Sequence, residues 1–232
     1  YVFHIAAEAR IQPAVENPLN AVRINALGTA TVLQCAREAG VKKVMYSSTS
    51  SAYGLVNESP NVETQPNDCL NPYSVSKVAG ENLCKMYTEL FDLPTVIFRY
   101  CNVYGERQPV RGQYAPVIGI FLRQLAAGEP LTIVGDGEQR RDFVHVSDVC
   151  NANIMAAISN PDEDAYGQIY NIGCGVNYSI NQIANMISDN QVSLPGRPGE
   201  CRVTQANTDK VRKTFGWKPQ VDLEDWIIAN VF

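Results

Sequence analysis

The amino-acid sequence predicts an α/β protein, built as a doubly wound parallel sheet with a smaller α+β lobe. Short β-branched segments alternate with long helical segments through the first hundred residues, which is the rhythm of such a sheet. After Asn102 this rhythm breaks into shorter helices and strands. The 232 residues, 45% of them hydrophobic, suffice for a large buried core. We therefore expect the sheet in residues 1–112, with later strands returning near 142–172, and the smaller lobe mainly in residues 113–232.

Two long helices are marked by their first residues. The pairs Asn17-Pro18 and Asn71-Pro72 each place a capping side chain before a proline at the first helical position, and apolar residues then recur at helical spacing. Thr95–Arg99 is continuous and β-branched, as in a strand buried on both faces. The sheet domain is expected to contain, in order, a strand at 1–7, a helix at 18–39, a strand at 42–47, a helix at 72–90 and a strand at 95–99.

The smaller lobe is predicted from shorter patterns of the same kind. A Gly-Asp-Gly turn at 135–137 ends one predicted strand. We expect helices at 116–127, 147–159, 181–188, 209–215 and 223–232, and strands at 131–134, 168–172 and 202–205.

Charge and cysteine usage narrow the class of partner. The formal net charge of −5, with 19 Lys and Arg spread along the chain, argues against a nucleic acid or an anionic membrane as the main partner, so an anion site must be a local pocket. The longest uncharged segment, 165–188, is too polar to cross a membrane. The seven cysteines are too widely spaced for a zinc site or a disulfide framework. We therefore expect no bound metal, and reduced thiols in the cytosol.

Tyr73 and Lys77 lie four residues apart at the start of the second long helix, so their side chains project from one face. A tyrosine hydroxyl titrates near pH ~10 and is a poor base at neutral pH unless a nearby cation stabilises the phenolate. Such a pair often arises by chance, so the spacing alone is a weak signal. Two segments strengthen it: Ser47–Gly54, rich in hydroxyls, and Arg99–Gly105 both follow predicted strands and point to the same sheet edge.

These segments, in this order, resemble the NAD-dependent sugar-nucleotide epimerase/dehydratase family of extended short-chain dehydrogenases/reductases, and the resemblance spans nearly the whole chain. Further matching segments are His4–Ala7, Asn25–Thr29, Gly135–Phe143, Tyr170–Gly173 and Arg197–Glu200. The resemblance implies a Rossmann-like sheet domain that binds NAD, a lobe that binds a UDP-sugar, and a homodimer in which the two long helices pack against their mates.

The resemblance also implies roles for single residues. Tyr73 is the acid/base on the sugar hydroxyl, Lys77 lowers its pKa and holds the nicotinamide ribose, and Thr49 takes the place of the catalytic Ser or Thr. A short hydroxyl can bridge the sugar oxygen and the phenol. Cofactor contacts are implied for Ala6, Ala7, Asn25, Ser47, Ser48, Tyr73, Lys77, Tyr100 and Val103. Substrate contacts are implied for Thr49, Asn102, Leu131, Ile133, Arg141, Arg197 and Thr204.

Among the substrate residues, Arg141 and Arg197 are expected to clamp the diphosphate, because a guanidinium offers paired donors to phosphate oxygens. Asn102 would bond the phosphate or the sugar. Leu131 and Ile133 would flank the uracil, although core packing explains Ile133 equally well.

Several residues near these motifs have simpler interpretations. Packing explains Ala6, Ala7 and Asn25 about as well as cofactor binding does. Arg140 is better explained as a solvated surface charge, and His145 as a structural histidine.

The reaction within the family is inferred from an absence. Its dehydratases carry an Asp-Glu pair immediately after the catalytic Thr, and its sugar-acid decarboxylases carry a Glu at the second position, whereas this chain has Ser50 and Ser51 there. A serine cannot replace a carboxylic acid, which leaves 4-epimerisation of a UDP-hexose through a 4-keto sugar. The alternatives are a UDP-glucuronate 4-epimerase, another nucleotide-sugar dehydratase or decarboxylase, or a catalytically silent sugar-nucleotide-binding or scaffold protein.

The resemblance also predicts the sugar and a missing segment. In the 4-epimerases the position of Thr204 forms a wall of the sugar pocket, and a small residue there leaves room for an N-acetyl group, so both acetylated and non-acetylated UDP-hexoses are expected substrates. The family's glycine-rich phosphate-binding loop has no counterpart here, and the chain opens on a finished strand, so we expect an N-terminally truncated fragment that lacks the first units of the sheet.

Overall fold

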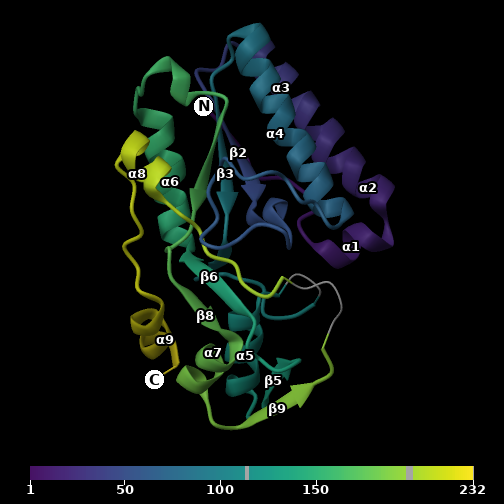
Figure 1. Ribbon diagram of the computed structural model, residues 1–232, viewed down its shortest axis with the longest axis vertical. Helices are drawn as coiled ribbons and strands as arrows, with labels where there is room; N and C mark the ends of the chain where they lie inside the picture. The colour runs from purple at the N-terminus through teal and green to yellow at the C-terminus, as the bar shows by residue number, and fades with distance from the viewer. Residues whose placement is uncertain (113–114, 197–200, 232) are drawn as a thin grey trace.

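The computed structural model describes residues 1–112, 115–196 and 201–231. Figure 1 shows two lobes: an upper lobe in which helices cover a sheet, and a lower lobe of shorter elements that holds the C-terminal end of the chain.

The upper lobe is built on a parallel sheet of four strands in the order β1-β2-β3-β7. These strands are β1 (Val2–His4), β2 (Val44–Thr49), β3 (Thr95–Tyr100) and β7 (Gln168–Ile172). Burial is complete or nearly so along β2 and β3, because helices cover both faces. The predicted parallel sheet of an α/β protein is thereby confirmed.

One face of the sheet is covered by two long helical segments that lie side by side (Figure 1). The first consists of α2 (Pro18–Val22), a π-helical turn (Arg23–Leu27) and α3 (Gly28–Glu38), and the second is α4 (Pro72–Phe91). The core between them and the sheet contains Leu33, Tyr46, Cys84, Tyr87 and Ile97.

Both predicted helix starts are confirmed. The Asn17 side chain accepts a hydrogen bond from the backbone N–H of Asn20 at 3.1 Å. The Asn71 side chain accepts one from Ser74 at 2.9 Å, and the Ser74 hydroxyl lies 3.4 Å from the Asn71 N–H, which completes a capping box. The first turn of α4, which carries Tyr73, is therefore held firmly.

The opposite face of the sheet is covered by α6 (Val146–Ile158) and α8 (Asp209–Phe215). Their apolar side chains form a second core with the strands, whose members include Met45, Phe98, Ala152, Tyr170 and Trp217.

The lower lobe has its own core. Its elements are α5 (Val117–Ala126), β5 (Leu131–Val134), α7 (Ile180–Ile187), β9 (Gln191–Leu194) and α9 (Leu223–Val231). Strands β5 and β9 pair in parallel, and α5 and α7 pack on them.

A small sheet that the sequence did not predict lies between these parts. It consists of β4 (Asn102–Tyr104), β6 (Arg140–His145) and β8 (Asn177–Ser179), with β6 in the middle. Strand β4 is parallel to β6, and β8 is antiparallel to it. Since β4 starts two residues after β3 ends, the chain passes directly from the large sheet into the small one.

Some short elements differ from the predictions. Helix α1 (Ile11–Glu16) and a 3₁₀ turn at Glu163–Ala165 were not expected. The strand predicted at 202–205 is reduced to one isolated bridge between Val203 and Arg140.

Asp142 ties β6 to two later segments of the chain. Its buried carboxylate accepts the backbone N–H groups of Cys174 at 2.7 Å and of Gly175 and Ala206 at 3.0 Å. Burial raises its pKa to about 6. A Cβ atom at Gly173 would lie 2.7 Å from this carboxylate, so the chain needs a glycine there. The end of β7 and the segment before α8 are thus anchored at one point.

Candidate active site

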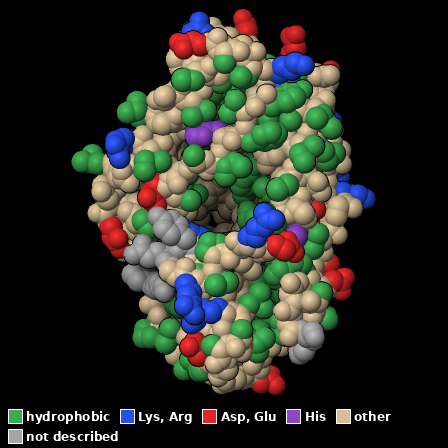
Figure 2. Space-filling view, turned by 180° about the vertical axis from the view of Figure 1, so that it is seen from behind, with side chains coloured by type: hydrophobic (Ala, Val, Ile, Leu, Met, Phe, Trp, Pro, Cys, Tyr) green, Lys and Arg blue, Asp and Glu red, His purple; other side chains and the backbone are tan. Residues whose placement is uncertain are grey.

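The carboxyl ends of β2 and β3 carry most of the predicted site. Thr49 and Tyr100, the last residues of these strands, pair with each other. In Figure 1 both strands end where the two lobes meet, and Figure 2 shows the surface hollowed between the lobes. The chain turns sharply after Thr49 into a 3₁₀ helix (Ser50–Tyr53), and the Thr49 hydroxyl accepts the N–H of Ser51 at 3.1 Å.

Thr49 and Tyr73 come together, as predicted. Burial raises the pKa of Tyr73, and a hydrogen bond with the Thr49 hydroxyl opposes this rise. The positive charge of Arg10 also lowers this pKa, and the lowering implied for Lys77 stays a prediction. Arg10 precedes α1 and belongs to no motif, so the sequence held no signal for it.

Lys77 lies one turn further along α4 and is 2% exposed. Its ammonium lies over the ring of Tyr46, with Nζ 4.3 Å from the ring centroid. Burial lowers the pKa of Lys77 to about 8, while Cys84 and Glu81 act in the opposite direction.

Two of the predicted cofactor residues, Ser47 and Tyr100, are joined in one hydrogen-bonded chain. The Ser47 hydroxyl donates to the Tyr100 hydroxyl at 3.2 Å, and the Asn153 side chain donates to the same oxygen at 2.8 Å. Within the described residues the Asn153 Oδ1 atom is buried without a hydrogen-bond partner. Asn153 lies on α6, about fifty residues from Tyr100, and sequence reasoning missed it.

Ser48 faces away from this chain of hydroxyls. Its hydroxyl donates to Glu81 at 2.5 Å in the protein interior. Glu81 in turn holds Arg99 through two hydrogen bonds of 2.8 and 2.7 Å. Successive strand residues point to opposite faces of the sheet, so the side chains of Ser47 and Ser48 cannot both contact the same ligand. The Ser48 side chain thus binds Glu81 in the interior, whereas a contact with the cofactor was predicted for it.

The remaining predicted cofactor residues lie around these. Asn25, in the π-helical turn, donates to Glu8 O at 3.0 Å and to the Ser76 hydroxyl at 2.9 Å, and it accepts the N–H of Glu8 at 2.8 Å. It therefore joins the loop after β1, which contains Ala6 and Ala7, to the first turns of α4. Val103 packs beside the second core from β4.

Arg141 and Thr204 of the predicted substrate site are brought together. The Nη1 atom of Arg141 and the backbone N–H of Thr204 both donate to Arg140 O, at 2.9 and 3.1 Å. The Thr204 hydroxyl oxygen is buried and has no partner among the described residues. Asn102 donates to Asp142 O at 3.3 Å. Arg197 lies outside the described residues.

In β5 the structure corrects the uracil contact expected of Leu131 and selects core packing for Ile133, for which the sequence left both alternatives open. Leu131 is fully buried and Ile133 is 5% exposed, both in the core of the lower lobe. Their neighbours Thr132 and Val134 are the half-buried residues of this strand. Side chains alternate along a strand, so Leu131 and Ile133 lie on the same face and are both buried in the core. Only residues on the other face of the strand are accessible to a ligand.

Arg140 and His145, which lie near this site, have structural roles. Arg140 donates to the Asn177 side chain at 2.6 Å and to its carbonyl oxygen at 2.8 Å, so it holds β8 instead of being a solvated charge as predicted. His145 is confirmed as structural, since its Nδ1 lies 2.7 Å from the Ser147 hydroxyl and its ring packs against Tyr104 and Trp226.

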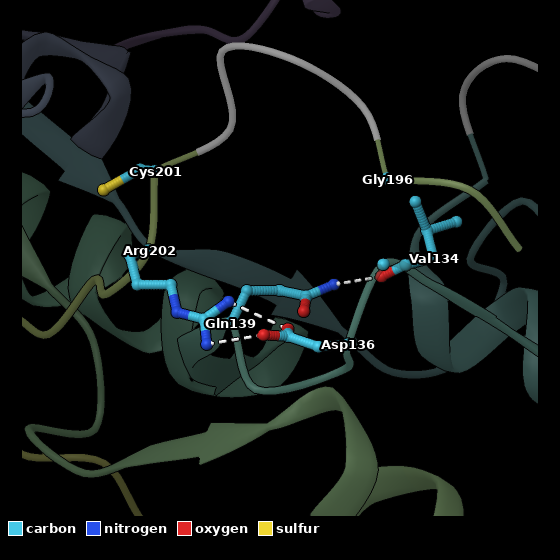
Figure 3. A pocket seen from close by; sticks show the side chains of 7 residues that line it. Val134, Asp136, Gln139, Gly196, Cys201 and Arg202 are labelled. Carbon is cyan, nitrogen blue, oxygen red and sulfur yellow. Dashed lines mark hydrogen bonds and ion pairs between the residues drawn. The ribbon is translucent and has the colours of Figure 1, made fainter. Parts of the chain in front are cut away.

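Figure 3 shows a pocket of about 310 Å³ in the lower lobe, lined by Val134, Gly135, Asp136, Gln139, Gly196, Cys201 and Arg202. Arg202 donates to both carboxylate oxygens of Asp136 at 2.8 Å. Because Asp136 already neutralises the Arg202 guanidinium, this guanidinium is a poor binding group for an anion. An adjoining pocket of about 490 Å³ shares Cys201 and Arg202. Neither pocket is lined by Thr49, Tyr73 or Lys77.

The part of the chain that the structure describes has neither a metal site nor a membrane-spanning helix. No group of three or more His, Cys, Asp or Glu side chains there could hold a metal ion. No helix there is long and apolar enough to span a membrane.

Known proteins resemble this chain in sequence and in fold. The UDP-glucose 4-epimerase of Mycolicibacterium smegmatis is 35% identical over 99% of this chain and 74% of its own length. The structure of the UDP-N-acetylglucosamine 4-epimerase from Methanobrevibacter ruminantium matches with a TM-score of 0.93 and 32% identity, over 100% of this chain and 75% of that one. The UDP-glucose 4-epimerase of Thermotoga maritima matches with a TM-score of 0.92 and 33% identity, with the same coverage. A family model described as the NAD dependent epimerase/dehydratase family matches residues 1–173. The fold is thus of the Rossmann type, the cofactor is NAD, and the chain belongs to the NAD-dependent epimerase/dehydratase family.

Proposed function

We propose that this protein is a UDP-hexose 4-epimerase, with Thr49, Tyr73 and Lys77 as its catalytic residues. One observation carries the proposal: the Thr49 hydroxyl, at the carboxyl end of β2, lies close enough to Tyr73 to lower the pKa of the phenol, and Lys77 lies one turn beyond Tyr73 on α4. Parallel sheets bind their ligands at this edge.

The residues at this edge fit NAD. The Ser47 and Tyr100 hydroxyls and the unpartnered Asn153 Oδ1 offer a carboxamide both donors and an acceptor. Lys77 offers an ammonium group to ribose hydroxyls. Held by these residues, NAD would supply a reversible hydride acceptor for the sugar.

The protein's own side chains move and guide the proton. Tyr73 takes the proton of the sugar 4-hydroxyl at its phenolic oxygen and gives it back after the keto sugar has turned. Thr49, bonded to Tyr73, orients the sugar hydroxyl toward it. The Arg10 charge favours the phenolate, because it lowers the pKa of Tyr73.

The residues after Thr49 favour epimerisation over elimination or decarboxylation. Ser50 and Ser51 stand where a dehydratase needs acidic side chains. With no carboxyl group at these positions, no acid is placed there to protonate a leaving hydroxyl. Relatives named as epimerases support the same reaction class.

The activity is tested on the full-length protein, which is incubated with NAD and UDP-glucose before the sugar is analysed by NMR. We expect conversion to UDP-galactose without loss of water or carbon dioxide. Net dehydration or decarboxylation would contradict the proposal. Tight sugar-nucleotide binding without any turnover would favour the scaffold alternative.

The size of Thr204 supports a substrate range that includes N-acetylated UDP-hexoses. Solved structures that resemble this chain do not choose between the sugars, because one is named for UDP-N-acetylglucosamine and another for UDP-glucose. Replacing Thr204 by Tyr is expected to lower kcat/KM for UDP-N-acetylglucosamine at least about tenfold, through a clash at C2, and to spare UDP-glucose. Thr204→Ser is the matched control and should keep both activities. Equal loss of both activities in Thr204→Tyr would show that Thr204 does not form this wall.

We further propose a homodimer formed through the outer faces of α2, α3 and α4. Large apolar side chains are exposed along these helices, and the most exposed are Leu19 (83%), Leu27 (62%), Val75 (50%) and Leu90 (68%). Exposed apolar patches of this kind mark interaction sites.

Leu27→Glu is expected to shift the protein from dimer to monomer in sedimentation velocity at micromolar concentration. A buried, unpaired carboxylate would oppose association. The control is Ile158→Glu on α6, which is 68% exposed on the opposite side of the sheet and should leave the dimer intact. A wild-type monomer at this concentration would refute the proposed dimer.

A further inference from the structure

Tyr46 is a residue of β2 whose side chain contacts α4, the helix that carries Tyr73 and Lys77. It is fully buried, its ring lies under the Lys77 ammonium at 4.3 Å, and its hydroxyl donates to the carbonyl oxygen of the same lysine at 3.1 Å. One side chain thus contacts both the charged end and the backbone of Lys77.

Gly80 makes this contact possible. A Cβ atom at Gly80 would lie 2.2 Å from the Tyr46 hydroxyl oxygen and 2.6 Å from the ring carbon that carries it. Glycine in the middle of a helix costs about 1 kcal/mol relative to alanine, and Gly80 lies in the interior of α4. The glycine is at the turn of α4 where the Tyr46 side chain approaches the helix backbone.

The other titratable groups that face Lys77 do little to stabilise its ammonium charge. On α4 these groups are Glu81 and Cys84, and on β1 the group is His4. The charge of Glu81 is shared with Arg99, which donates to both of its oxygens. Burial raises the pKa of Cys84 and lowers that of His4 to about 4, so both side chains are neutral at pH 7. The face of the Tyr46 ring, negative by its quadrupole, is therefore a main partner of the ammonium.

We propose that Tyr46 is a positioning residue for Lys77 and that Gly80 is required to admit it. The ring face holds the ammonium and keeps it protonated, and the hydroxyl fixes the backbone of the same residue before any cofactor binds. Only the consequence for catalysis rests on the proposed function; the effect on Lys77 itself does not.

The test is the titration of Lys77 in the full chain, followed by NMR of lysine labelled with ¹³C at Cε and assigned with Lys77→Met. Loss of a desolvated cation–π contact removes stabilisation from the ammonium form, so Tyr46→Leu should lower the pKa of Lys77 by about one to one and a half units. Tyr46→Phe keeps the ring and should lower it by less than half as much. Tyr87→Phe, on the same helix, is the control because its hydroxyl bonds Gln34 instead, and it should change nothing.

Gly80→Ala gives a second route that does not depend on folding of the Leu variant. The added methyl displaces the ring, so the pKa of Lys77 should fall in the same direction. If Lys77 must be protonated for turnover, the alkaline limb of the rate profile of Tyr46→Leu should also move about one pH unit lower.

The proposal is overturned if Tyr46→Leu and Gly80→Ala leave the pKa of Lys77 unchanged, or if Tyr46→Phe lowers it as much as Tyr46→Leu does. A protein without epimerase activity in which Lys77 shifts as expected would refute the proposed function alone.

Discussion

Replacing Tyr73 by Phe is expected to lower kcat for UDP-glucose by about 10²- to 10⁴-fold, the range typical of a lost general acid/base. In the full-length protein the substitution removes one hydroxyl oxygen and leaves the half-buried ring, so the fold and the bound NAD should remain. Steady-state kinetics measures the first effect, and calorimetry with NAD the second. Tyr87→Phe is the matched control on the same helix. A Tyr73→Phe variant with near-normal kcat would place the proton transfer elsewhere.

The pH dependence offers a separate check on the same residue. The phenol must lose its proton to act as a base, so the rate rises as pH increases through the pKa of Tyr73. The Thr49 hydrogen bond lowers this pKa. Thr49→Val should therefore move the acid limb of the rate profile to higher pH, and no movement would show that Thr49 does not act through Tyr73.

Breaking the buried pair of Glu81 and Arg99 is expected to have the largest effect on stability. Both side chains are 1% exposed, and the shortest distance between them is 2.7 Å. Glu81→Leu leaves a buried guanidinium without its partner, which costs about 3–5 kcal/mol. Urea denaturation measures this loss.

Two further variants serve as controls for Glu81→Leu. The double variant Glu81→Leu/Arg99→Met removes both charges and should recover much of the loss, since apolar replacement of a whole buried pair is often tolerated. Arg212→Gln breaks the exposed pair of Arg212 with Asp209 and should cost about 0–1 kcal/mol. A Glu81→Leu variant as stable as Arg212→Gln would show that the interior pair is dispensable.

The large sheet and its long helices are encoded locally, which is why the sequence predicts them. Asn71 and Pro72 start α4 by capping and a fixed φ angle, and the apolar run Val96–Phe98 needs only burial on both faces to become a strand. In contrast, β6 begins with Arg140, Arg141 and Asp142, which show no strand pattern. These polar side chains are accommodated by partners far along the chain, such as Asn177 for Arg140 and Ala206 for Asp142.

The candidate site divides in the same way. Thr49 and Tyr73 follow from motifs at a strand end and a helix start. Arg10, Tyr46 and Asn153 reach the site from separate elements, and their relevance depends on contacts that only the folded chain creates. The error at Leu131 and Ile133 has a simpler source, because a strand of four residues gives too short a pattern to tell its two faces apart.

The π-helical turn at Arg23–Leu27 has a consequence for length variation among relatives. Such a turn holds one residue more than an α-helical turn, and each helical residue rotates the chain by about 100°. A homologue with one residue fewer between Asn17 and Gly28 would form a regular helix, and its counterpart of Leu19 would lie about a quarter turn away from the position seen here. Sequence alignments across this helix therefore need a one-residue gap wherever the π turn is lost. Without any substitution, different side chains of the helix then lie on its outer surface.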